Sequence, residues 1–273
     1  MSSSSRPVAG LIAPAFCFLL ICFIVPVLLL LSTSLQGHAG WSFENFGTFF
    51  QSTLNRRVLW TTIRLGVLVT LSSVVLGYIA ALSIVDLSAG NRGRVLGLTM
   101  LPLMISPVAR TYAWLVLLGQ AGVLNDFLQL LGVTQQPVRF LFTETAVYLG
   151  LLQLFLPLMI LSLVSALENL PPDVVTAART LGAGWLTVFF KVILPLTREG
   201  LIIGGTLVFT GSITAYITPA VLGGSRVLML ETLLYQRVHL GNDIKTASVI
   251  AVILVGLSFV ANYVIRKLSS RKT

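Results

Sequence analysis

The chain has 273 residues, of which 56% are hydrophobic and only 10% are charged, and its formal net charge is +9. Soluble domains carry about a quarter charged residues, so this composition excludes a soluble globular protein. The basic residues are scattered and have no aromatic-rich polar domain beside them, which argues against nucleic acid as a partner. In a membrane protein, an excess of Lys and Arg is typical of loops that contact anionic headgroups, so we expect these residues to face membrane lipid.

Apolar runs of about eighteen residues or more recur along the chain, and each is long enough to cross a bilayer. The sequence therefore predicts an all-α polytopic membrane protein. Its six predicted transmembrane helices are residues 9–35, 59–85, 95–118, 145–167, 200–222 and 246–265. Cys17 and Cys22 lie in the first of them and are interpreted as small apolar residues. With two His in the whole chain, they form no cluster with zinc-site spacing, so we expect no metal.

The even number of spans places both termini on the same side of the membrane. Residues 266–273 form a strongly basic tail, and basic residues concentrate on the cytoplasmic side. We therefore expect both termini to be cytoplasmic. The predicted regions are a disordered N-terminus at 1–8, the first transmembrane helix with a periplasmic loop at 9–58, the membrane core at 59–265 and the cytoplasmic tail at 266–273.

Prolines and glycines predict where the spans bend or approach one another. Prolines lie inside or at the ends of predicted spans, among them Pro102, Pro107, Pro157 and Pro219. Proline removes a backbone hydrogen bond, and such breaks are tolerated in a membrane where they pack on protein or line a cavity. Three glycines of the fifth predicted span, Gly204, Gly205 and Gly211, offer a face for close helix approach. These features favour a packed bundle with a pathway over separate anchors.

The segment 122–132, between the third and fourth predicted spans, has apolar residues at helical spacing. These residues are Leu124, Phe127, Leu128 and Leu131. The pattern predicts a short amphipathic helix that lies at the outer surface of the membrane.

The longest predicted cytoplasmic segment, residues 168–199, has the pattern of two short helices. Pro172 suits the first position of a helix, and Gly182 suits the residue after its end. Asp173 in the first turn and Arg179 in the last turn complement the helix dipole. A second helical stretch places three apolar residues on one side and is expected to break at a proline; these residues are Trp185, Phe189, Val192 and Pro195.

The first of these helices has one narrow apolar face, made of residues at positions i, i+3, i+4 and i+7. The residues are Val174, Ala177, Ala178 and Leu181. An apolar face exposed to water normally needs a partner, so we expect the segment 168–199 to dock on another protein.

The stretch TAARTLGAGWLTVFFKVILP, Thr176–Pro195, resembles the signature of ABC-importer permeases: EAA, three residues, Gly, nine residues, then I-x-L-P. The residues in register are Ala177, Ala178, Gly182, Leu194 and Pro195, while Thr176 occupies the position of the Glu and Val192 that of the Ile. The resemblance implies that residues 168–199 form a coupling loop, whose helix docks into a groove on a cytoplasmic ATPase. It also implies that these residues, Thr176 included, carry the coupling to that ATPase.

Two further stretches extend the resemblance. Val108–Val133 and Ser212–Gly224 look like the permeases of spermidine/putrescine-type importers, whose relatives also carry opines, aminophosphonates and other small solutes. The resemblance implies the type I importer permease fold in the bacterial inner membrane. It also implies a second permease beside this chain, an ATPase dimer below it and a periplasmic solute-binding protein above it. We expect the second permease to be a different chain.

No enzyme motif accompanies the resemblance. The sequence contains no GxSxG, no HExxH and no GxxxxGK followed by Ser or Thr. The chain itself is therefore expected to be no enzyme and to hold no cofactor, with ATP and Mg²⁺ bound by the partner ATPase. The alternatives are an ion-coupled secondary transporter, which would have inverted repeats and a buried acid or His, and a channel subunit, which needs no partner-seeking loop.

Arg110 lies in the outer part of the third predicted span. A charge that faces lipid costs about 2.5–3.5 kcal/mol at the bilayer centre and less near the surface. Arg110 is therefore expected to line the substrate path, to extend outward to the headgroups, or to pair with Glu144 or the partner permease. The chain has no clearly intramembrane Asp or Glu, so Arg110 favours an anionic or zwitterionic solute, whereas the resemblance favours a polyamine.

Five other residues are candidates for the substrate path: Tyr112, Trp114, Thr214, Tyr216 and Thr218. The faces of the three aromatic residues can pack against the carbons of a solute. The aromatic belt at the membrane surface explains Trp114 equally well. The two threonines lie beside Pro219, where a broken helix would expose backbone groups to a solute.

Overall fold

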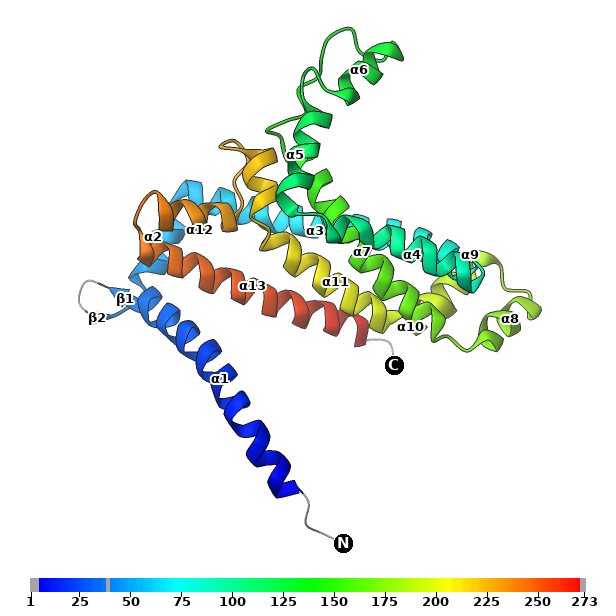
Figure 1. Cartoon of the computed structure of the whole chain (residues 1–273), viewed down its shortest axis with the longest axis horizontal. Coiled ribbons are helices and arrows are strands. Elements are labelled where there is room, and N and C mark those ends of the chain that lie inside the picture. The colour runs from blue at the N-terminus through cyan, green and yellow to red at the C-terminus, as the bar shows by residue number, and fades with distance from the viewer. Residues whose placement is uncertain (1–4, 38–39, 271–273) are drawn as a thin grey trace. The chain divides into compact units, whose positions relative to one another are not determined.

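The computed structural model describes residues 5–37 and 40–270, and these residues are almost entirely helical (Figure 1). They belong to two compact units, one comprising Met1–Arg56 and Leu234–Ile253, the other Arg57–Leu233 and Leu254–Thr273. Within the described residues, five helices are long and apolar enough to cross a membrane, and the number is six when the bent pair Trp185–Leu196 and Arg198–Ile213 is counted as one span. This number agrees with the six predicted spans.

The first unit begins with α1, Ser5–Leu35, a helix of 31 residues. Its described side chains between positions 14 and 29 are all exposed within the chain. A helix that is apolar on every side is suited to a membrane rather than to water. α1 begins before the predicted span and includes residues 5–8, which were predicted to be disordered, while residues 1–4 lie outside the described part.

Two antiparallel strands of two residues each and a short helix follow α1. They are β1, Gln36–Gly37, antiparallel to β2, Gly40–Trp41, and then α2, Glu44–Gln51. Asn45 on α2 fixes the end of α1, because its Nδ2 donates to Ser34 O and to Gln36 O, both at 3.0 Å. The unit also contains parts of α12, Leu230–His239, and of α13, Ile244–Ser270. α13 carries Arg266 and Lys267 of the predicted tail, and residues 271–273 lie outside the described part.

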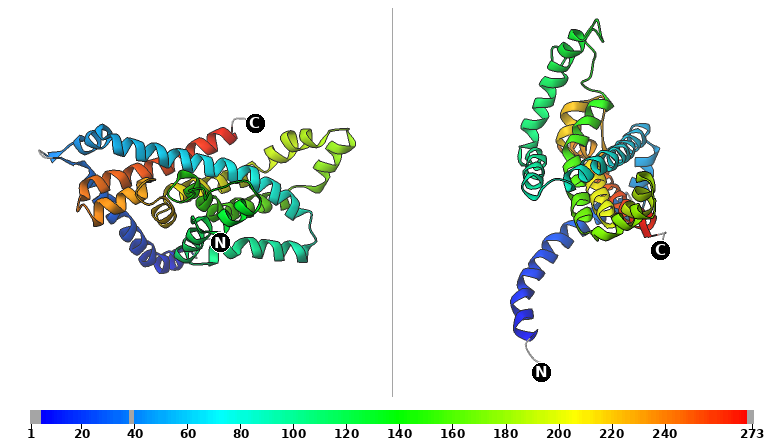
Figure 2. Two further views of the ribbon diagram at one scale, coloured as in Figure 1. Left: turned by 90° about the horizontal axis from the view of Figure 1, so that it is seen from above. Right: turned by 90° about the vertical axis from the view of Figure 1, so that its right-hand side faces the viewer.

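The core of the second unit is made mainly by three helices: α3, Thr53–Val85, α7, Glu144–Glu168, and α11, Arg198–Ile213. Figures 1 and 2 show α7 running beside α11. Fully buried side chains come from all three helices, namely Leu65, Val69, Leu151, Met159, Leu163, Val208 and Ile213. Apolar packing within this unit therefore holds together the helices α3, α7 and α11, and the predicted site residues lie on the segments that these helices support.

Glycines allow α11 to approach α7 closely. A Cβ on Gly204 would lie 2.8 Å from Met159 Sδ, and one on Gly211 would lie 2.3 Å from the ring of Phe155. Gly205, in contrast, has no atom nearer than 3.9 Å. The predicted close approach is therefore confirmed for two of the three glycines, and the third faces a looser contact.

The predicted third span, 95–118, is broken. α4, Ala89–Met104, and α5, Pro107–Leu118, are separated by Ile105 and Ser106, whose ψ angles are 140° and 128°. A residue that precedes proline avoids the helical region, and the proline itself opens the next helix. The prediction of one continuous helix here is therefore wrong.

Two helices, α5 and the short helix α6, Val123–Leu130, follow this break. Together they form the apolar segment Pro107–Leu130, which is long enough to cross a membrane. α6 confirms the helix predicted within 122–132.

The predicted fifth span, 200–222, is also broken. α11 ends at Ile213, residues 215–216 are not helical, and the π-helix η2, Pro219–Gly223, starts at the proline. Proline has no backbone N–H to continue a preceding helix but fits the first turn of a new one. The break predicted beside Pro219 is therefore confirmed, and the predicted span 200–222 consists of two helical pieces.

Candidate functional site

The first helix of the loop 168–199 is α8, Pro172–Thr180, with Asp173 in its first turn and Arg179 in its last. Gly182 follows with φ +83°, a conformation that favours glycine. Gly182 N donates to Arg179 O at 2.9 Å, and Ala183 N donates to Ala178 O at 3.1 Å. This pair of bonds is a Schellman motif, so the predicted helix end at Gly182 is confirmed.

The second helical stretch begins with α9, Trp185–Val188, and continues without interruption through the π-helix η1, Phe189–Ile193, and α10, Leu194–Leu196. Pro195 lies inside α10, and the chain bends by 72° only at Thr197, before α11. The prediction of a break at Pro195 is therefore wrong. Pro195 sits in the first turn after the π-helix, where a missing backbone N–H is tolerated.

Large apolar side chains of this loop are exposed at the surface of the chain. Leu181 is 88% exposed, Trp185 58%, Leu186 64% and Phe190 60%. We call these four residues the exposed loop face. Leu181 and Trp185 belong to the apolar faces predicted from helical spacing, whereas Leu186 on α9 and Phe190 on η1 were missed.

The six residues predicted to couple this chain to an ATPase do not share one surface. Thr176 and Ala177 are exposed on α8, Gly182 forms the turn, and Pro195 is exposed on α10. Ala178 and Leu194 are half-buried against the core. The first part of the signature therefore lies at the surface of the loop, and its last part lies at the bend that leads into α11.

Arg110 on α5 is buried, with 8% of its surface exposed. Its Nη1 donates to Pro102 O at 2.7 Å, across the break between α4 and α5. Its Nη2 is buried without a hydrogen-bond partner among the described residues. The expectation that Arg110 extends to the headgroups or pairs with Glu144 is wrong for this chain, since Arg110 is buried and Glu144 forms an ion pair with Arg64.

The two aromatic residues near Arg110 lie in different surroundings. Tyr112 is 58% exposed. Trp114 is half-buried, and its Nε1 donates to Gln153 Oε1 at 3.4 Å. Successive helix positions are about 100° apart, so residues at positions 110 and 112 face nearly opposite directions. The structure therefore does not bring Arg110 and Tyr112 together.

The remaining candidates lie at the break between α11 and η2. Thr214 is exposed and its Oγ1 donates to Thr210 O at 2.8 Å, while Tyr216 is half-buried. Thr218 is only 4% exposed, and a Cβ on Gly150 of α7 would lie 2.7 Å from its methyl group. Thr218 thus packs against α7, which leaves Thr214 and Tyr216 as the accessible members of this group.

A groove that was not predicted lies between α7 and the α10–α11 bend. Its volume is about 940 Å³, and its polar lining residues include Ser165, Asn169, Arg198 and Glu199. These residues belong to helix ends that are far apart in the sequence, so no local pattern announces the groove. Among the described residues, no group of three or more His, Cys, Asp or Glu is placed to hold a metal ion.

Comparison with known proteins gives a consistent result. Residues 18–273 match the family described as "Binding-protein-dependent transport system inner membrane component". The chain is 32% identical over 271 residues to the spermidine/putrescine transport system permease protein PotB of Haemophilus influenzae, across 96% of this chain and 94% of the relative. It is 29% identical over 259 residues to the putative 2-aminoethylphosphonate transport system permease protein PhnU of Salmonella typhimurium, across 93% and 89% of the two chains.

The fold also has a counterpart among solved structures. A chain of a bacterial ABC transporter involved in the import of the acidic polysaccharide alginate superposes with a TM-score of 0.81 at 19% identity, across 98% of this chain and 96% of that chain. The fold, the family match and the relative that aligns over nearly the whole chain all indicate a multi-pass transport subunit of the inner membrane. The chain belongs to the family of inner membrane components of binding-protein-dependent transport systems.

Proposed function

We propose that this chain is one permease subunit of an ABC importer that carries a small solute into the cell, with ATP and Mg²⁺ bound by a dimer of separate cytoplasmic ATPase subunits. The observation that carries the proposal is the loop 168–199, which presents the exposed loop face between two transmembrane helices. An apolar cluster of this kind in water calls for a protein partner. An energy-supplying subunit that docks there can move α7 and α11 directly, because the loop joins them.

The residues that we assign to docking are those at the surface of the loop. Thr176, Ala177 and Gly182 present small side chains beside Leu181, so another subunit can approach the backbone of α8 closely. Ala178 and Leu194 act from behind this surface, because both pack against the core, while Pro195 lies exposed in the last helical turn before the bend at Thr197.

A second permease, which we expect to be a different chain, completes the path. α1 supports this assignment, since its described side chains between positions 14 and 29 are exposed within the chain and a neighbouring subunit or lipid must surround them. A periplasmic solute-binding protein delivers the solute, as the family description implies. Both termini lie in the cytoplasm in this arrangement, which places α8 and the basic end of α13 on the same side of the membrane.

Transport follows an alternating-access cycle. ATP binding closes the two ATPase subunits and draws the coupling loops of the two permeases together, which reorients the spans from inward-facing to outward-facing. The docked binding protein then releases its solute into the opened path. The break at residues 214–216 is a suitable place for the solute to pass, because backbone groups that leave a helix can bind a polar ligand there.

The solute class is a small amino compound, and a polyamine is our first choice because PotB of Haemophilus influenzae is named for spermidine and putrescine. The buried Nη2 of Arg110 favours a solute that also carries a carboxylate or phosphonate, and PhnU of Salmonella typhimurium is named for such a compound. A guanidinium nitrogen with an unused donor binds an anionic oxygen well. The remaining path candidates, Tyr112, Trp114, Thr214, Tyr216 and Thr218, do not separate these two classes.

The test is ATP hydrolysis by the assembled complex, purified with its ATPase, second permease and binding protein. Spermidine, putrescine, 2-aminoethylphosphonate and an opine are added one at a time, and ATP hydrolysis and uptake into liposomes are measured. Stimulation of both by one solute is expected. Hydrolysis that no binding protein or solute stimulates, together with uptake driven by an ion gradient, would contradict the proposal.

A further inference from the structure

Helix α3 is linked to both ends of the loop that joins α7 to α11. We call these ends the first root, Glu168–Asn169, and the second root, Thr197. Both links lie within the second unit. Neither is visible in the sequence, because the partner residues are about eighty or more positions apart in the chain.

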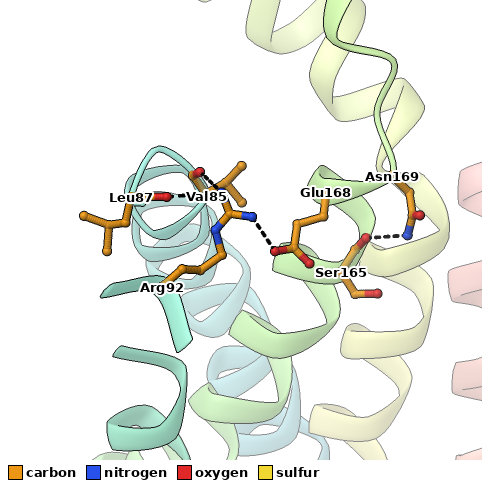
Figure 3. Close-up of polar contacts among 6 residues, drawn as sticks. All are labelled: Val85, Leu87, Arg92, Ser165, Glu168 and Asn169. Atoms are coloured by element: carbon orange, nitrogen blue, oxygen red, sulfur yellow. Dashed lines mark hydrogen bonds and ion pairs between the residues drawn. The ribbon is translucent and has the colours of Figure 1, made fainter. Parts of the chain in front are cut away.

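At the first root, Arg92 on α4 joins the end of α3 to the end of α7 (Figure 3). Its Nη1 donates to Glu168 Oε1 at 2.7 Å. Its Nη2 donates to Val85 O at 2.6 Å and to Leu87 O at 3.2 Å. Val85 is the last residue of α3, and carbonyl groups at the end of a helix lack partners within that helix. One guanidinium therefore satisfies acceptors from two elements.

The junction requires an arginine. A guanidinium presents separate nitrogens in a rigid fork, whereas the ammonium of Lys is a single point charge. The ion pair alone would contribute little, because the side chains of Arg92 and Glu168 are 28% and 41% exposed. The ion pair acts by fixing positions: the two backbone carbonyls hold the guanidinium in place, and the guanidinium holds Glu168.

The first root is itself held in place. Asn169 caps α7, and its Nδ2 donates to Ser165 O at 2.7 Å, as Figure 3 shows. Only three residues, 169–171, separate α7 from α8. A displacement of α8 therefore reaches Glu168 with little slack in the chain between them.

At the second root, Tyr78 on α3 is buried and its hydroxyl lies 2.9 Å from Thr197 Oγ1. Thr197 Oγ1 donates its only hydrogen to Ile193 O at 2.8 Å, so the Tyr78 hydroxyl is the donor between the two. The Tyr78 ring packs edge-on against Phe189 at 5.3 Å, and Phe189 stacks on Trp185 at 5.7 Å. A series of direct contacts thus leads from the exposed loop face to α3.

We propose that Arg92 and Tyr78 are positioning residues that fasten the two roots of the coupling loop to α3, so that a loop displaced by the ATPase moves α3 together with α7 and α11. The inference rests on the proposed function and adds the helix that transmits the movement. Neither residue touches ATP or solute in this account. Both act by keeping the loop in register with the bundle.

Two conservative variants remove the links and little else. Arg92→Lys keeps the positive charge and loses the fork, while Tyr78→Phe keeps the ring on Phe189 and loses the hydroxyl. In the complex reconstituted with its partners in liposomes, each is expected to lower the solute transported per ATP by about two- to tenfold, which corresponds to one or two hydrogen bonds. Each should also lower the ratio of solute-stimulated to unstimulated hydrolysis. A variant that merely unfolds would instead lower the amount of assembled complex.

The chain offers matched controls for both variants. Arg94→Lys alters an exposed arginine two residues from Arg92. Tyr148→Phe removes a 2.7 Å hydroxyl bond from α7 to Ser72 on α3, far from either root. Both controls are expected to transport as much solute per ATP as the wild type.

Thr197 supplies an independent pair of variants. Thr197→Ser keeps the hydroxyl and is expected to couple normally, whereas Thr197→Val should reproduce the loss in Tyr78→Phe. Wild-type coupling in Arg92→Lys, Tyr78→Phe and Thr197→Val, or an equal loss in the two controls, would overturn the inference while leaving the proposed function intact. A wild-type complex that solute does not stimulate would overturn the proposed function first and the inference with it.

Discussion

The α7–α11 pair and the loop between them, residues 168–199, are both rich in apolar residues, but these residues are buried in the pair and largely exposed in the loop. In the pair, Met159, Leu163 and Val208 are fully buried and the helices approach over glycine. In the loop, Leu181 and Leu186 are exposed at the surface of the chain. Buried side chains stabilise this chain, whereas exposed ones are available to a partner. Substitutions in the pair should therefore reduce folding, and substitutions in the loop should reduce coupling.

The largest effect is expected from Gly200→Val on α11. A Cβ at this position would lie 2.5 Å from Ala166 Cβ and 2.7 Å from Ser162 O on α7, and the backbone oxygen cannot move aside. Overpacking of this kind costs about 1–3 kcal/mol or more, so the yield of folded protein and its melting temperature in detergent should fall. Gly205→Ala is the control, since its nearest neighbour is 3.9 Å away and stability should be retained. Equal melting temperatures for both variants would contradict the close packing.

Leu181→Asp should show the opposite behaviour. Leu181 is 88% exposed, so the melting temperature of the isolated chain should stay the same. Burial of a leucine in an interface contributes about 1.5–3 kcal/mol, so binding of the ATPase subunits should weaken by about tenfold or more, measured by co-purification at graded concentrations. Gly182→Asp, which places a charge in the adjacent turn, should uncouple transport while the subunit still inserts. Unchanged ATPase binding and transport in both variants would place the docking surface elsewhere.

Arg110→Met tests whether the third span belongs with the packed core or with the transport path. If the buried Nη2 holds an anionic group of the solute, the KM for uptake should rise by about tenfold or more, the range of a hydrogen bond to a charged group. Val116→Ala, on the exposed side of the same helix, should leave KM unchanged. A lower melting temperature with an unchanged KM would assign Arg110 to the α4–α5 break alone.

The smallest effect concerns Glu231 at the start of α12, outside the membrane-spanning helices. Burial raises the pKa of this carboxyl above its ordinary value. The folded state therefore binds the proton more tightly than the unfolded state, so stability should rise as the pH falls through the pKa of the folded protein towards the ordinary value of a free carboxyl. The melting temperature of the wild type should increase modestly when the pH is lowered from 7 to 5, and that of Glu231→Gln should change less. The same change with pH in both proteins would contradict this assignment.

Much of the architecture could be predicted because its signals are local. Apolar runs mark the membrane helices, and Pro172, Asp173, Arg179 and Gly182 mark the ends of α8. Such signals act through backbone geometry and the helix dipole, which depend on neighbouring residues only. The same reasoning found the break beside Pro219. It failed at 95–118, where Pro107 was treated as a kink although the two residues before it leave the helix.

The parts that could not be predicted depend on contacts between distant segments. No pattern in the sequence singles out Arg92, yet its guanidinium meets Glu168. An ion pair with Glu144 was one expectation for Arg110, but Glu144 pairs with Arg64 instead. Pairing of charges is decided by the packing of helices, and no periodicity in the sequence records it. The same limit applies to Leu186 and Phe190, whose exposure depends on which side of α9 and η1 packs against the core.

Photo-crosslinking from the loop tests the central claim most directly. Leu181 is replaced by p-benzoylphenylalanine in the whole complex in membranes, and Leu131, which is 58% exposed beyond α6, is replaced in the same way as a control. A crosslink from position 181 to the ATPase subunit, and none to that subunit from position 131, is the result that the account predicts. A crosslink from position 181 to the periplasmic binding protein, or no ATPase crosslink in an actively transporting complex, would contradict it.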